Sequence, residues 1–98
     1  MTNKYESPAE FEERLDEMIK MGKLKAQYKS LLLEIDELGA KACAEGLISG
    51  LGWGVDANNF ILDEYEIMNE NGNPLYLSLV ETRDYLEKLI ADSEQANE

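Results

Sequence analysis

The stretch EGLISGLGWGVDANN, residues 45–59, decides the fold, because it separates a helical half of the chain from a half with strand patterns. Its glycines surround Trp53, the only tryptophan of the 98 residues. A dinucleotide-binding loop needs G-x-G-x-x-G between a strand and a helix, and a P-loop needs G-K-[ST]. Neither motif is present, so we interpret residues 47–59 as a glycine-rich joint. Trp53 would either pack on the core or stand exposed as a binding anchor.

The residues before this joint predict two helices, a helical hairpin over residues 1–46. The first begins at a Ser-x-x-Glu capping box, Ser7 and Glu10, and ends near Gly22. The second is expected from about Lys23 to Glu45, with a regular apolar seam along it. The seam can serve self-association or packing within the chain, and its width favours the second. Its residues are Leu24, Tyr28, Leu31, Ile35, Leu38 and Ala42.

The residues after the joint predict a β-hairpin over residues 60–78. Asn71-Gly72 suits a two-residue type I′ turn, which would set Met68 opposite Leu75. Pro74 cannot donate a ladder hydrogen bond, so its strand is expected at a sheet edge. A second Ser-x-x-Glu box opens a helix over residues 79–92, followed by a frayed tail, 93–98. The chain is therefore expected to be a single α+β domain of order ααββα.

Composition narrows the classes of function. The chain lacks histidine, which removes imidazole bases, Ser-His and Cys-His pairs and ordinary zinc or iron sites. We therefore expect no enzyme, no cofactor and no metal. The lone Cys43 allows no intrachain disulfide, which favours a cytoplasmic location. No apolar run approaches the roughly 20 residues that span a bilayer, so no membrane partner is expected.

Charge is the strongest global signal. The net charge is −12, and residues 30–98 carry all of it, with fifteen acids against three bases. Direct binding to nucleic acid is therefore disfavoured by repulsion, whereas a basic partner would be attracted.

These observations predict a non-enzymatic acidic inhibitor that occupies the basic site of a nucleic-acid-binding protein, of the DNA-mimic or phage counter-defence type. The alternative is an adaptor that self-associates through the Leu24–Ala42 seam, and the chain is expected to be a monomer or a homodimer. The predicted contacts of the inhibitor lie in the hairpin and the last helix: Asp56, Asp63, Glu64, Glu66, Glu70, Glu81, Asp84 and Glu87.

Overall fold

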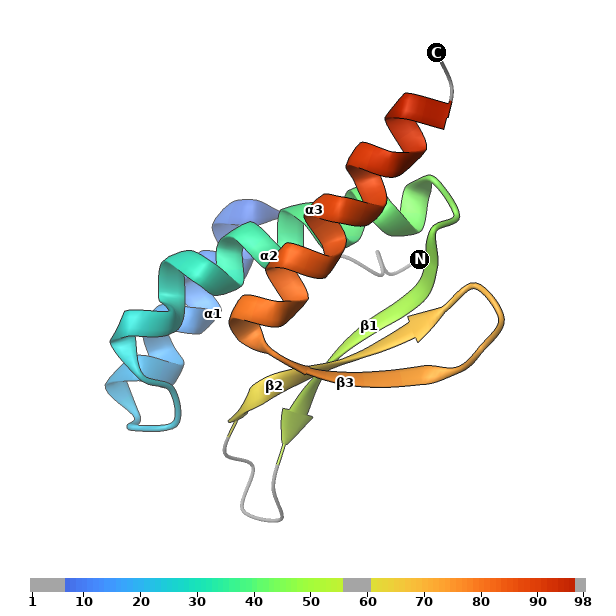
Figure 1. Ribbon diagram of the computed structural model, residues 1–98. Coiled ribbons are helices and arrows are strands. Elements are labelled where there is room, and N and C mark those ends of the chain that lie inside the picture. The colour runs from blue at the N-terminus through green and yellow to red at the C-terminus, as the bar shows by residue number, and fades with distance from the viewer. Residues whose placement is uncertain (1–6, 56–60, 97–98) are drawn as a thin grey trace, which may run out of the picture.

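Three α-helices lie on one face of a three-stranded antiparallel sheet in the computed structural model, which describes residues 7–55 and 61–96 (Figure 1). The strands follow the order β1-β2-β3. The predicted α+β class is confirmed. The elements are α1 (Pro8–Lys20), the 3₁₀ turn η1 (Ala26–Tyr28), α2 (Lys29–Ala44), β1 (Ile48–Val55), β2 (Ile61–Asn69), β3 (Pro74–Ser78) and α3 (Leu79–Ala96).

The glycine-rich stretch is a strand, so its interpretation as a joint is wrong for residues 48–55. Glycine alternates here with larger residues, which is the period of a strand. Leu51 pairs with Ile67, and Trp53 pairs with Tyr65. Ile67 and Tyr65 are buried beneath the helices, so Leu51 and Trp53 share the covered face of the sheet. Of the glycines described in residues 45–59, only Gly46 has a positive φ, 75°, and it lies just after α2.

Helix α1 follows its prediction closely. The Ser7 Oγ accepts from the Glu10 backbone N–H at 3.2 Å, and the Glu10 carboxylate accepts from the Ser7 N–H at 3.1 Å. These hydrogen bonds hold the pKa of Glu10 below its usual value. Beyond the last helical residue, Gly22 adopts φ 73° and reverses the chain.

Helix α2 begins at Lys29, later than the predicted Lys23. Lys25 is extended, with φ −74° and ψ 129°, and η1 follows it. These residues turn the chain back along α1. The apolar spacing from Leu24 onward therefore predicted a longer helix than the one observed. Leu24 is nevertheless buried, from the connection rather than from the helix.

The β-hairpin is confirmed, but its predicted register is wrong by one residue. Met68 pairs with Pro74, and Ile67 pairs with Leu75. The loop has three residues instead of two, because Asn69 closes it: its side-chain Oδ1 accepts from the backbone N–H groups of Asn71 and Asn73. Gly72 supplies the positive φ, 80°. The strand of Pro74 is an edge, as predicted.

Helix α3 starts at the predicted capping box and runs to Ala96, past the predicted end at residue 92. The expected fraying is wrong for residues 93–96, because α2 holds this end. Lys41 Nζ lies 3.2 Å from the Glu94 carboxylate, and the Ser93 hydroxyl donates to Glu45 at 3.5 Å.

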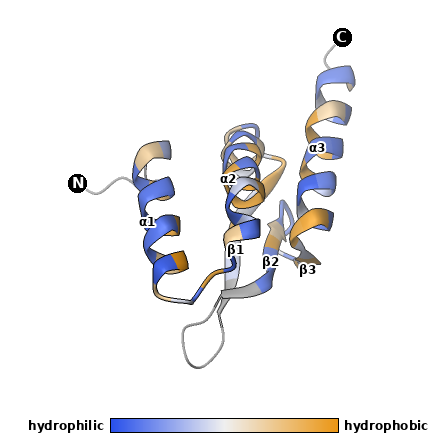
Figure 2. Ribbon diagram, turned by 90° about the vertical axis from the view of Figure 1, so that its left-hand side faces the viewer, coloured by the Kyte–Doolittle hydropathy of each residue, from blue (hydrophilic) through white to orange (hydrophobic). Residues whose placement is uncertain are grey.

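The core lies between the helices and the sheet, and Figure 2 shows hydrophobic segments alternating with hydrophilic ones along the helices. Along the predicted seam, Leu24, Ile35 and Ala42 are buried in the chain's own core, and Tyr28, Leu31 and Leu38 are half-buried. Packing within the chain is therefore the use that the structure shows for this seam. Gly39 brings α2 close to β1, because a Cβ built there would overlap the Leu51 side chain.

Two glycine substitutions should distinguish a tightly packed position, Gly39, from a position beside open space, Gly52. Gly39→Val should lower the free energy of unfolding by about 1–3 kcal/mol, since the new side chain must displace Leu51. Gly52→Val should change it by no more than about 0.5 kcal/mol or raise it, because nothing lies within 4 Å of its Cβ position. Urea unfolding of both variants tests this; equal losses would contradict the packing of β1 on α2.

Candidate functional site

A pocket of about 370 Å³ lies where α1, α2 and β1 meet. Such a volume lies at the small end of the range for ligand sites, roughly 300–1,000 Å³. Aromatic rings, two charged side chains and small residues line it together. The lining residues are Phe11, Arg14, Asp36, Gly39, Ala40, Cys43, Ser49, Gly50, Leu51, Trp53 and Tyr65.

Trp53 forms the aromatic part of this pocket with its neighbours. Its ring meets Phe11 edge-on, with centroids 5.5 Å apart, and lies 5.7 Å from the ring of Tyr65. Phe11 and Tyr65 are buried, whereas Trp53 is half-buried. The Trp53 ring thus packs on the core and also lines the pocket, and its use as a binding anchor stays a prediction.

Charges of both signs line the same pocket. The Arg14 guanidinium lies 5.9 Å from the centroid of the Phe11 ring. Burial raises the pKa of the Tyr65 hydroxyl, the negative charge of Asp36 raises it further, and Arg14 opposes the shift. Cys43 is half-buried and lines the pocket as well. Apart from Trp53, no sequence pattern indicated this pocket, because its walls come from segments far apart in the chain.

The predicted acidic contacts of β2 divide between the two faces of the sheet. Tyr65 faces the helices, so Glu64 and Glu66 face away from them. The Tyr76 hydroxyl hydrogen-bonds Glu66, which raises the pKa of Tyr76. Asp63 lies by contrast near the helix connection, where it accepts from the Tyr28 hydroxyl at 3.1 Å and lies 3.7 Å from Lys25 Nζ.

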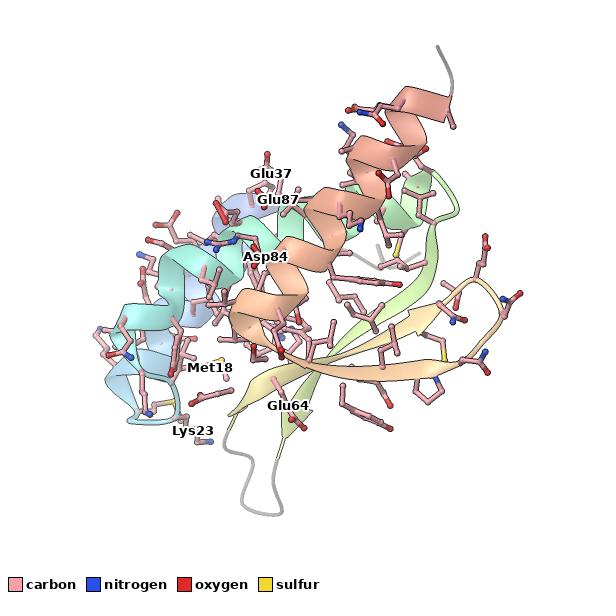
Figure 3. The ribbon with its side chains drawn as sticks, in the orientation of Figure 1. Met18, Lys23, Glu37, Glu64, Asp84 and Glu87 are labelled. Carbon is pink, nitrogen blue, oxygen red and sulfur yellow. The ribbon has the colours of Figure 1, made fainter. Side chains whose placement is uncertain are left out.

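The predicted contacts of α3 have different surroundings. Glu81 caps the helix through Ser78. Arg83 bridges two helices, with its guanidinium 3.4 Å from Asp84 and 3.6 Å from Glu34 of α2. Glu37 and Glu87 lie on the same outer side of the helices as Asp84 (Figure 3). We name Glu34, Glu37, Asp84 and Glu87 the α2–α3 acidic cluster.

The predicted acidic residues therefore form no single surface. Asp84 and Glu87 belong to the α2–α3 acidic cluster, whereas Glu64 lies at the sheet, away from it (Figure 3). Glu70 is exposed in the hairpin loop. Asp56 lies outside the described residues. Sequence reasoning missed Glu34 and Glu37, whose proximity to α3 depends on how the helices pack.

Lys29, the first residue of α2, neutralises part of the acidic charge of α1. Lys29 Nζ lies 2.8 Å from Asp16 and 3.0 Å from Glu12, and these bonds raise the pKa of Lys29.

Within the described ranges, no group of three or more Cys, Asp or Glu side chains is arranged to hold a metal ion. Over the same part of the chain, no helix combines the length and apolar character needed to cross a membrane.

Comparisons of the chain with protein-family models, curated proteins and solved structures find no match.

The buried Tyr65 hydroxyl predicts a loss of stability at alkaline pH. The pKa of Tyr65 in the folded chain lies above the unfolded value of about 10. The contribution of the neutral hydroxyl to the free energy of unfolding is therefore complete below pH 10, and it is lost as pH rises through the folded pKa. Tyr65→Phe should therefore show a smaller fall in unfolding free energy above pH 10 than the parent chain. The pKa of Lys29 is also raised, but Lys29 is present in both proteins, so its effect on the pH dependence cancels in the comparison. Urea unfolding over an alkaline pH series tests this, and parallel curves would contradict it.

Proposed function

We propose that the chain is a non-enzymatic binding module that inhibits a nucleic-acid-binding protein by occupying its basic site. The observation that carries this proposal is the α2–α3 acidic cluster, in which the Arg83 guanidinium pairs with Glu34 and Asp84, while Glu37 and Glu87 lie on the same outer side of the two helices as Asp84 (Figure 3). The partner is a basic protein, and the proposed setting is the cytoplasm.

The spacing of these carboxylates suits a site that normally receives phosphates. Glu34 and Glu37 are three residues apart on α2, as are Asp84 and Glu87 on α3. Three residues of α-helix rise about 4.5 Å, and packed helices lie about 8–10 Å apart. Each strand of duplex DNA carries about one negative charge per 3.4 Å of axis. The two carboxylates on each of these helices therefore offer a comparable density of charge.

The α2–α3 acidic cluster adds little to the stability of the fold, so stability does not explain why these carboxylates lie together. Like charges close together on helices destabilise them by a few tenths of a kcal/mol per pair. Arg83 is exposed to solvent by about a third, 34 %, and exposed ion pairs contribute about 0–1 kcal/mol. A basic partner would offset the remaining repulsion, which supports a role in binding.

The global charge supports the same conclusion. The net charge of −12 comes from residues 30–98, which include α3 and all of α2 except Lys29. This field attracts a basic surface and speeds its association at low ionic strength, while it repels nucleic acid. Because the chain has no histidine, it also lacks the commonest catalytic base.

Self-association through the Leu24–Ala42 seam is the less favoured function. Leu24, Ile35 and Ala42 are buried in the chain's own core. A dimer through this seam would require that core to open, so the alternative remains a prediction without a structural observation in its favour.

Two matched double variants test which acidic surface binds the partner. Glu37→Lys with Glu87→Lys should weaken capture of basic proteins from a bacterial lysate by about tenfold or more and lower the salt concentration that elutes them. Glu64→Lys with Glu66→Lys changes the charge equally on the outer face of the sheet. This control should retain most of the binding.

The measurement is the amount of each captured protein across a salt series, after circular dichroism has verified that both variants are folded. Loss of capture in the sheet variant alone would move the contact to β2. Unchanged capture in both variants would contradict the proposed function.

A further inference from the structure

We propose that the free edge of β1 and the pocket beside it bind an extended segment of a partner protein. The segment would add a strand to the sheet and place one apolar side chain in the pocket, with basic residues on either side. Only its positive charge rests on the proposed function; the groove itself follows from the geometry of β1, α1 and α2.

The outer edge of β1 is unusually open to strand addition. Within residues 7–55 and 61–96, β1 pairs with β2 on one side and with no strand on the other, and residues 46–55 carry no charged side chain. Exposed edges are usually protected by charge, proline or short length. The other edge, β3, is short, begins at Pro74 and leads directly into α3. In the described residues, no backbone hydrogen bond joins another element to the outer edge of β1.

The regular part of β1 is long enough to receive a short strand. Its register with β2 is continuous from Gly50 to Trp53, between two irregularities. Along such an edge, N–H and C=O groups point outward at every second residue, and an extended polypeptide matches this pattern. Gly50 and Gly52 have no side chains that could shield the edge.

The pocket lies beside this edge, where it can select a side chain. Leu51 and Trp53 of β1 form one wall, and Gly39, Ala40 and Cys43 of α2 form another. Its volume of about 370 Å³ has room for one large apolar side chain, which the Trp53 ring would contact. In recognition by strand addition, main-chain hydrogen bonds give affinity and such pockets give specificity.

Charge favours a basic segment over a second copy of this chain. A copy brings a net charge of −12 against an equal charge, which opposes association at ordinary ionic strength. Asp36 and Arg14 both line the pocket, so the pocket itself carries charges of both signs, and the net charge of the chain is what attracts a basic segment. Arg14 lies on the α1 side of the pocket, where its positive charge would repel a basic residue of the segment.

A synthetic peptide tests the groove directly. The probe alternates valine and threonine, carries a central phenylalanine and has lysines at both ends. On binding to the full chain, it should slow amide hydrogen exchange between Gly50 and Trp53 by about tenfold or more, as expected for newly protected edge amides. A peptide with proline at alternate positions, which lacks N–H donors there, should not bind.

A matched pair of variants tests the pocket. Ala40 is exposed and lines the pocket, whereas Ala44 is exposed on the same helix and does not. Ala40→Tyr should fill the pocket and weaken peptide binding by about tenfold or more. Ala44→Tyr adds the same ring elsewhere and should leave binding unchanged. Both substitutions avoid the core, so the variants should fold.

The outcomes separate the groove from the proposed function. Protection of β1 together with loss of binding in Ala40→Tyr supports the groove. If a peptide with glutamates in place of the lysines binds the groove equally well, the groove holds but the basic partner is contradicted. Binding without protection of β1, with amide changes only at the α2–α3 acidic cluster, would overturn the groove. A peptide-free chain that doubles its mass and protects β1 would assign the edge to a second copy and also overturn the proposal.

Discussion

The packing of β1 against the helices is the contact on which the rest of the structure depends. Leu51 lies over Gly39, where α2 has no side chain, and Trp53 lies between Phe11 and Tyr65. A two-stranded hairpin would be marginal by itself. As the third strand, β1 completes a sheet that can bury its inner face under the helices. The same packing leaves the outer edge of β1 open and a pocket beside it.

The sequence predicted the features whose causes are local. The two Ser-x-x-Glu boxes, the stop at Gly46 and the hairpin around Gly72 all depend on residues close together in the chain. The strand over residues 48–55 was missed because its glycines were interpreted as turn formers, although their alternation with Leu51 and Trp53 is the period of a strand. The hairpin register failed for a similar reason, because the Asn69 side chain changes the loop.

The candidate sites were harder to predict, because they combine segments distant in sequence. Acidic residues of the hairpin and the last helix were expected to act together, but alternation in β2 separates Asp63 from Glu64 and Glu66. The α2–α3 acidic cluster instead gains Glu34 and Glu37 from a helix that was considered only for its apolar seam. Packing between α2 and α3 thus determines which charges gather, and a sequence pattern within one element carries no such information.

Competition with DNA tests the proposed inhibitor most directly. The tagged chain would be incubated with bacterial lysate, and the captured proteins would then be exposed to increasing concentrations of duplex DNA at constant salt. If the chain occupies a basic nucleic-acid site, DNA should release a basic nucleic-acid-binding protein in a dose-dependent way, because both ligands compete for one surface. Retention of every captured protein at saturating DNA, or capture of none, would contradict the account.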